Sequence, residues 1–494
     1  MISAEDVREV TRTLASVRRS LEPLVVQGTR AAGPDEISTI ERFRDELSRF
    51  EAHHLAAQLT TLAGRLRENS ADAASGLYRA QASLRLFERV LTTEYVQTLL
   101  PPDESANASP APSAPNSPRT GVKEEDRRLL GVLRELCGAI EDLTASGLSA
   151  ASKITRSKIQ VSANEAAKHK LQRLSPALRY VAEEVDRFVG ESTDFSPTRL
   201  FFFLGRSWLL TKGMERAVLD DDAERLSELR WQRSTQPTPV RELTAVTLGV
   251  HKRVVSGVSA AFDFKLRVMS ADVPNLEGAS LSWAFVHPYD RSVSANFSAD
   301  ALLHVSQPQG FRPRDLLADK TIAFSEVMVT KDARAGRVHL GPKSKVTSGT
   351  THRGFASSPS WDLGRTRSRL AAYSPGPLDL EIELEEEVVL DEWEIGAATA
   401  GLRPDQVGYP VRFRGLEALA IASTESEGQA LRASLENLRK KKHRPPLFAL
   451  AHFEDGQIIL RPLSLLEDDG AEHLMISDDK INLAELTRAV MRRA

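Results

Sequence analysis

A chain of 494 residues with 41% hydrophobic and 27% charged residues is too long for one core and predicts a soluble protein of two to four domains. Its net charge of −3 excludes an overall attraction to nucleic acid or to an anionic membrane, so any such site must be a local patch. The single cysteine, Cys137, excludes an intramolecular disulfide and a cysteine-based zinc site. Its place beside an apolar helical stripe predicts a buried thiol.

Heptad spacing predicts helices in residues 1–100. One stripe has apolar residues alternately three and four apart, and Pro23 predicts that this first helix ends or bends there. A second apolar seam runs from Ile40 to Leu66 with a shift near residue 50 that is typical of a stutter. A third helix is expected over residues 73–100. Three such helices joined by short turns predict an antiparallel helical bundle. The first stripe consists of Val7, Val10, Leu14, Val17, Leu21 and Leu24.

Residues 101–122 are predicted to be a linker, because six of the eighteen residues from Pro101 to Pro118 are proline and most others are Ser, Ala or Asn. Residues 123–235 predict a second helical bundle. Its stripes run over 129–143 and 171–188, and Pro197 begins a further helix where its missing N–H costs least.

From about Pro239 the spacing of the apolar residues changes from the helical period of about 3.5 to every second residue. Phe262, Phe264, Leu266 and Val268 alternate with charged residues, which predicts a half-buried strand. Further strands are expected over 281–286, 321–330, 337–340, 378–390 and 409–414, and a hairpin over 447–463. Helices are expected near 426–441 and 482–493. The fold class is therefore multidomain α + β: helical bundles, then a mainly antiparallel barrel-like or sandwich-like β domain over 239–494, with a division into two subdomains near residue 375 left open.

No strong catalytic signature is present: Walker A, G-x-G-x-x-G, G-x-S-x-G and H-E-x-x-H are all missing. Glu51 and His54 share a helix face, as in di-iron bundles, but a second Glu-x-x-His is lacking. The histidines of the β region have no short ligand spacing. We therefore expect no catalytic residue, no metal and no cofactor, and keep an enzyme without a known motif as the third hypothesis.

The most distinctive local cluster lies in residues 331–370, where nine Lys/Arg stand against Asp332 and Asp362. Gly and Ser let backbone N–H groups approach phosphate, and two aromatic rings are placed to stack on bases. OB-like barrels bind single strands with loops of this kind. The candidate polyanion-binding or partner-binding residues of this predicted loop are Lys343, Lys345, Arg353, Phe355, Trp361, Arg365, Arg367 and Arg369.

Two alternatives compete with a binding loop. The loop is followed by Leu378–Glu394, which holds nine acids and no Lys or Arg, so the two segments are suited to neutralise each other. Exposed ion pairs of this sort contribute only ~0–1 kcal/mol each. The loop is otherwise simply solvated. A second basic run, Lys440 to Arg444, ends a predicted helix, where cations are favoured by the helix dipole.

The leading hypothesis is a non-enzymatic interaction or scaffold protein of the bacterial cytoplasm, which binds protein partners through helical seams and β-domain loops. The alternative is a nucleic-acid-binding module that uses residues 331–370. No membrane association is expected, because the N-terminus lacks a signal sequence and the apolar run Leu200–Leu210 is too short to span a bilayer. Heptad seams also leave open a homo-oligomer. The arginine-rich first hundred residues, which contain no lysine, favour a high-GC bacterial source.

Overall fold

The computed structural model describes residues 4–101, 124–148, 153–230, 237–255, 258–289, 297–331, 336–373, 376–379, 385–454, 456–477 and 486. The chain forms two compact units. The helical unit comprises residues 1–233 and 364–380, and the β unit comprises residues 234–363 and 381–494. The multidomain α + β class is confirmed. Most of the predicted linker and of the predicted helix over 482–493 lies outside the described residues.

The helices of the N-terminal segment follow the predicted apolar stripe. All six stripe residues are buried, with at most 9% of their surface exposed. Pro23 separates the first two helices, as predicted, because proline cannot continue the hydrogen-bond ladder of the preceding helix. The helices are α1 (Ala4–Leu21), α2 (Pro23–Gln27), α3 (Pro34–Arg49), α4 (His53–Arg67) and α5 (Ala73–Leu99).

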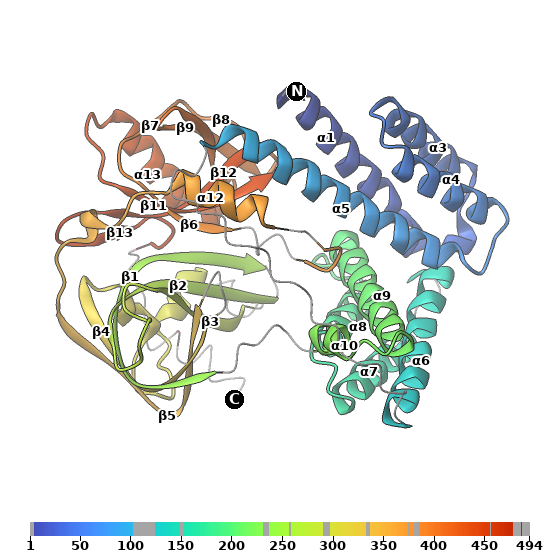
Figure 1. Ribbon diagram of the computed structural model, residues 1–494, viewed down its shortest axis with the longest axis horizontal. Helices are drawn as coiled ribbons and strands as arrows, with labels where there is room; N and C mark the ends of the chain where they lie inside the picture. The colour runs from blue at the N-terminus through green and yellow to red at the C-terminus, as the bar shows by residue number, and fades with distance from the viewer. Residues whose placement is uncertain are drawn as a thin grey trace. The chain divides into compact units, whose positions relative to one another are not determined.

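The predicted stutter near residue 50 is wrong, because the chain turns there. Glu51 adopts the left-handed region with φ 58°, and α3 and α4 pack against each other as a hairpin (Figure 1). The apolar shift in the sequence marks a change of helix. Glu51 is thus in a turn, and the exposed His54 bonds to Gln58 at 3.0 Å. The described part of the chain holds no group of three or more His, Cys, Asp or Glu placed to bind a metal ion.

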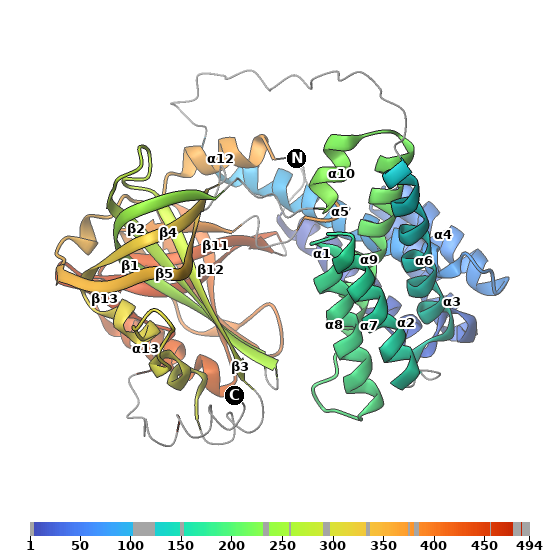
Figure 2. The same cartoon turned by 90° about the horizontal axis from the view of Figure 1, so that it is seen from below.

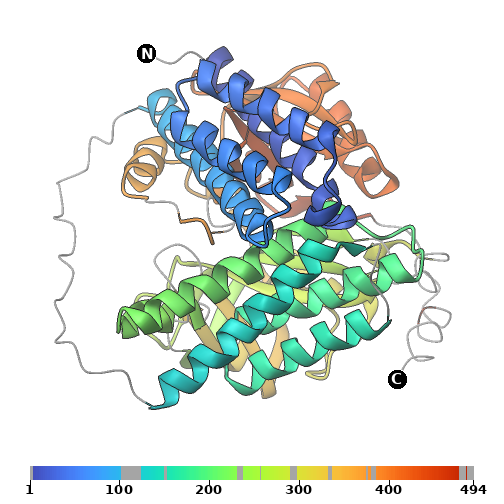
Figure 3. The same cartoon turned by 90° about the vertical axis from the view of Figure 1, so that its right-hand side faces the viewer.

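The second set of helices shares its core with the first. A single apolar cluster includes residues from both sets, and the Tyr78 hydroxyl of α5 bonds to Thr144 of α6. Figure 3 shows the blue helices of the first set beside the teal and green helices of the second. Cys137 is buried, as predicted, and burial raises the pKa of its thiol to about 12. The division of these helices into two domains, residues 1–100 and 123–235, remains a prediction. The helices are α6 (Glu124–Ser146), α7 (Lys153–Lys168), α8 (Leu174–Val189), α9 (Pro197–Leu219) and α10 (Ala223–Arg230).

The β unit begins with a closed barrel of five strands in the order β1-β2-β3-β5-β4 (Figure 2). Strands β3 and β5 pair in parallel, and every other neighbouring pair is antiparallel. The four apolar residues of the predicted alternation in β2 are 1% exposed or less and fill the barrel. A five-stranded barrel of this kind is the architecture of OB folds. The strands are β1 (Thr238–Val255), β2 (Val258–Ala271), β3 (Ser280–Tyr289), β4 (Lys320–Lys331) and β5 (Gly336–Thr351).

The second sheet repeats this connectivity. Its order is β6-β11-β12-β10-β9-β7. Only Asp391 and Glu392 separate β6 from β7, so these two end strands are one bent stretch of chain that takes the place of β1. Strands β9, β10, β11 and β12 then take the places of β2, β3, β4 and β5. The parallel pair β10–β12 corresponds to β3–β5 of the first barrel. Both sheets therefore have OB-like topology. The main elements are β6 (Glu386–Leu390), β7 (Trp393–Ile395), β9 (Gln406–Phe413), β10 (Leu416–Ser423), α13 (Gln429–Lys440), β11 (Leu447–Glu454) and β12 (Gln457–Leu466), with short strands β8 (Thr399–Ala400) and β13 (Ala471–His473).

The first barrel and the second sheet, which we call the second barrel from its OB-like topology, pack directly on each other within the β unit. Val246 and Leu248 of β1 share an apolar cluster with Phe448 of β11 and Leu463 of β12. Gly249 lies at the contact, where a Cβ atom would stand 2.8 Å from Phe448 Cδ1 and 2.9 Å from Leu463 Cβ. The missing side chain is what allows the strands to approach so closely.

Candidate nucleic-acid interface

The segment predicted as a binding loop is largely regular structure. Strand β5 extends through Thr351, and its antiparallel register with β4 continues to the pair Lys320↔Thr351. A 3₁₀ turn covers Phe355–Ser357, and helix α12 covers Leu363–Ala371. The expectation of a loop over 331–370 is therefore wrong for residues 341–351, which are strand, and for residues 363–371, which are helix. In the strand, the exposed polar residues form its outward face.

The two aromatic residues of the segment are buried. Phe355 is 2% exposed and meets the His352 ring edge-on at 4.8 Å. Trp361 is 5% exposed, stacks on Phe413 with ring centroids 6.2 Å apart, and donates its backbone N–H to the Val389 carbonyl at 2.8 Å. Both rings hold the β unit together, so stacking on a base would require them to leave the core.

The eight candidate residues fall into both compact units. Arg365, Arg367 and Arg369 lie on α12 in residues assigned to the helical unit, and Arg367 donates to the Leu100 carbonyl at 2.8 Å. Lys343, Lys345 and Arg353 belong to the β unit, on β5 or directly after it. Only these last three cations therefore lie in the β unit, spaced along β5 and the residues directly after it, and we name them the basic strip.

A bulge in the β4–β5 ladder positions the two lysines of the basic strip. Val327 pairs with Leu340 and Ser325 with Lys345, so Glu326 alone opposes four residues of β5. Ser344 points inward from this bulge, and its hydroxyl donates to the Glu326 carbonyl at 2.6 Å. Lys343 and Lys345, on either side of Ser344, both point to solvent.

The surface around the basic strip is rich in hydroxyl groups. Further along β5, the side chains of Thr347, Ser348, Thr350 and Thr351 are exposed. Residues 333–361 contain no Asp or Glu. Glu326 of the neighbouring strand β4 is exposed, and so is Glu242 of β1, the strand beyond β4, where it pairs in register with Ser325. The strip offers cations and hydroxyls, the groups that bind phosphate oxygens.

The acidic strand does not neutralise the basic strip. Glu385 pairs with Arg461, Glu387 with Lys265 at 3.6 Å, and Asp391 with Arg414 at 2.7 Å. Within the described part of the chain, Lys343, Lys345 and Arg353 form no ion pair. Glu381 and Glu383 lie outside the described residues. Glu385, Glu387 and Asp391 are thus paired with other cations of the β unit and not with the strip.

The second basic run has a structural role at one residue. Arg444 donates to the Leu438 carbonyl at 2.9 Å and caps the end of α13, consistent with the predicted stabilisation of a helix C-terminus. Lys440, Lys441 and Lys442 are exposed.

A buried polar cluster lies between the two barrels. His251 of β1 and Asp263 of β2 are paired in register, and Lys265 contacts Asp263 at 2.9 Å. From the second barrel, His452 lies 3.4 Å from Glu454. Burial, and then the positive charges of Arg461, Arg253, Lys265 and His452, lower the pKa of His251 to about 2. Sequence reasoning missed this cluster, because it is formed by residues about 200 positions apart.

This cluster predicts loss of stability in acid. Because the pKa of His251 is about 2 in the folded chain and about 6.5 when unfolded, the unfolded chain alone takes up a proton below pH 6.5. The free energy of unfolding should therefore fall by up to about 1.4 kcal/mol per pH unit between pH 6.5 and 5. Urea unfolding of His251→Gln should lose this slope, whereas His443→Gln, an exposed control, should keep it. An unchanged slope in His251→Gln would contradict the assignment.

The pKa of Glu454 is also lowered to about 2, because hydrogen bonds from His452 and Arg403 outweigh its burial. Glu454 therefore adds to the loss of stability in acid only below about pH 4.5.

Comparison with known proteins gives no family. No family model matches the chain, and no curated protein matches it. Among solved structures, it is similar to the HINa domain of Ifi202 in complex with 20-bp double-stranded DNA, at 9% identity, covering 46% of this chain and 94% of that chain with a TM-score of 0.20. It is also similar to a murine DNA-binding protein bound to double-stranded DNA, at 10% identity, covering 49% of this chain and 100% of that chain with a TM-score of 0.19. TM-scores this low do not establish a common fold.

Proposed function

We propose that the β unit binds nucleic acid through its phosphate backbone, with the basic strip as the contact surface. The observation that carries this proposal is the basic strip itself, whose exposed cations lie along β5 of an OB-like barrel and directly after it, without an ion pair among the described residues. OB-like barrels are platforms for oligonucleotides. Lysine, arginine and hydroxyl groups hold phosphates without reading sequence.

The mode of binding follows from the lack of exposed rings. Among the described residues of the β unit, the large exposed apolar side chains are Val255, Met269, Val286 and Met328, and none is aromatic. Binding of single strands draws much of its affinity from stacking of bases on aromatic side chains. Contacts restricted to phosphates depend little on base identity. We therefore expect binding with little sequence preference and with double strands bound at least as well as single strands.

The test is substitution of the basic strip. The variant Lys343→Gln/Lys345→Gln/Arg353→Gln should weaken binding of a labelled 20-bp duplex at 50 mM salt by roughly a hundredfold or more, because three phosphate contacts are lost. The slope of log K against log[salt] should become shallower by roughly 2–3. Fluorescence anisotropy of the full chain across a salt series measures both quantities.

A matched control separates the strip from net charge. Lys158→Gln/Lys168→Gln/Arg216→Gln changes the charge by the same amount on exposed residues of the helical unit and should bind as the wild type does. Equal weakening in the two triple variants would point to non-specific attraction. An unaltered affinity in the strip variant would exclude the strip as the contact surface.

The protein-scaffold hypothesis, the cytoplasmic location and the bacterial source remain predictions. Among the described residues, no helix combines the length and apolar composition needed to cross a bilayer. Helical seams that associate between chains would show as a dimer or larger species in light scattering.

A further inference from the structure

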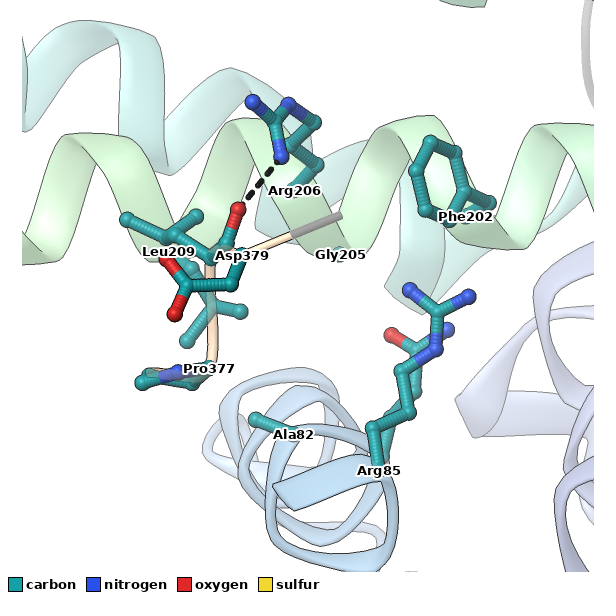
Figure 4. A pocket seen from close by; sticks show the side chains of 10 residues that line it. Ala82, Arg85, Phe202, Gly205, Arg206, Leu209, Pro377 and Asp379 are labelled. Atoms are coloured by element: carbon teal, nitrogen blue, oxygen red, sulfur yellow. Dashed lines mark hydrogen bonds between the residues drawn. The ribbon is translucent and has the colours of Figure 1, made fainter. Parts of the chain in front are cut away.

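The segment that connects the two barrels along the chain contains a short turn, and this turn packs within the helical unit. Residues 364–380 are assigned to that unit although the flanking residues belong to the β unit. Within it, the Gly376–Asp379 turn lies beside α5 and α9, and Leu378 is 9% exposed and joins the apolar core of the helices. Figure 4 shows the turn with α5 residues Ala82 and Arg85 on one side and α9 residues Phe202 and Gly205 on the other.

The turn is held rigid by its own hydrogen bonds. The Asp379 N–H donates to the Gly376 carbonyl at 3.1 Å, and Pro377 occupies the second position of the turn, where its fixed φ is favourable. The Asp379 carboxylate accepts from the Gly376 N–H at 2.7 Å and from the Tyr373 hydroxyl at 3.0 Å. A segment that is ordered before binding loses less entropy when it docks.

The helices offer one directed contact and one apolar contact to this turn. Arg206 of α9 donates to the Leu378 carbonyl at 2.8 Å (Figure 4). Leu378 belongs to the apolar core of the helices, and it lines one small pocket together with Leu209 and Ala82. Directly beside this place, the absence of a side chain at Gly205 lets α9 approach Gln81 of α5, where a Cβ atom would lie 2.0 Å from Gln81 Oε1. The contacts of the turn with the helices thus come from the side chain and the backbone carbonyl of its third residue, Leu378.

We propose that the groove between α5 and α9 is a peptide-recognition site for a Gly-Pro-Leu-Asp turn, occupied in the resting chain by Gly376–Asp379. Emptying the groove turns the helical unit into a receptor for the same turn supplied on a separate peptide. The chemistry required of the ligand is a leucine, a proline-stabilised turn and an aspartate that accepts hydrogen bonds within it. This inference is independent of nucleic-acid binding.

The experiment uses the full chain and a fluorescein-labelled peptide, Tyr-Ser-Pro-Gly-Pro-Leu-Asp-Leu, which is residues 373–380. In the variant Leu378→Glu the chain's own turn cannot occupy the groove, so the peptide should bind at least about tenfold more tightly than to the wild type, where the tethered turn competes at high effective concentration. Leu219→Glu places the same substitution at an exposed site of α9 and should match the wild type. Adding Arg206→Ala to Leu378→Glu should weaken peptide binding about tenfold, the usual effect of losing a hydrogen bond from a charged donor.

A milder variant keeps the test decisive if Leu378→Glu does not fold. Leu378→Ala should also raise peptide affinity over the wild type, and circular dichroism at 222 nm verifies the helices in each variant. Folded Leu378 variants that bind the peptide no better than the wild type would overturn the proposal. So would a peptide with leucine replaced by glutamate that binds equally well.

Discussion

Replacing Lys252 with alanine should lower the free energy of unfolding of the β unit by about 3–5 kcal/mol, the range typical of breaking a buried ion pair. Lys252 of β1 is buried, and its ammonium group contacts Asp300 Oδ1 at 3.0 Å and Glu427 Oε2 at 3.2 Å. Asp300 lies in the first barrel's β3–β4 connection and Glu427 just before α13 of the second. The lysine therefore ties the two barrels together.

The cost arises from what the substitution leaves behind. Asp300 is 4% exposed, and its remaining hydrogen bond, from the Ser477 N–H at 2.9 Å, does not replace a cation. Arg253→Ala, at the next residue and exposed, should change stability by less than about 0.5 kcal/mol. Chemical denaturation at pH 7 measures both variants. A loss below about 1 kcal/mol for Lys252→Ala would mean that the pair is solvated in solution.

Replacing Glu184 with alanine should destabilise the helical unit by a similar amount, about 3–5 kcal/mol. The Glu184 carboxylate of α8 is 1% exposed and pairs with both Arg187 and Arg199. It also accepts the Ser196 N–H at 3.0 Å, at the start of α9. One carboxylate thus accepts hydrogen bonds from two arginine side chains and from the backbone N–H at the start of α9.

The neighbouring acid supplies the control for this prediction. Glu183 also pairs with Arg187, at 3.5 Å, but its side chain is 50% exposed. Glu183→Ala should therefore cost about 0–1 kcal/mol. The thermal midpoint and the urea midpoint of the two variants are to be compared with the wild type. If the two substitutions have equal effects, burial of Glu184 is not what makes its pairs strong.

The helical unit was largely predictable because its signal is local. Heptad spacing marks buried residues such as Leu14 and Leu21 within one helix, whatever the helix later packs against. The turn at Glu51 was not predictable from that spacing, because two successive helices can present apolar residues that look like one shifted seam. Glutamate, unlike glycine, does not favour the left-handed conformation that Glu51 adopts, so nothing in the sequence marks the break between the helices.

The second half of β5 escaped prediction for a different reason. Its inward positions include Ser344 as well as Val346, so the alternation that marks a half-buried strand is weak. The strand forms because β4 supplies a complete antiparallel ladder down to Lys320. Pairing between strands overrides the turn preference of Ser, Thr and Gly.

The candidate site was half predictable. Lys343, Lys345 and Arg353 could be recognised as surface cations from the sequence, since lysine and arginine are rarely buried without a partner. The burial of Trp361 depends on Phe413, fifty-two residues further along the chain, and no local pattern reports such a contact. The same holds for Arg461, which pairs with Glu385 and so removes it as a counter-ion for the strip.

Nucleic-acid binding by the basic strip can be tested directly by one measurement. A labelled 20-bp duplex is titrated with the wild-type full chain at 50 mM salt and again at 200 mM. We expect saturable binding that is weakened roughly tenfold or more at the higher salt, because about three phosphate contacts release counter-ions. No binding at 50 mM salt, or binding that is insensitive to salt, would contradict it.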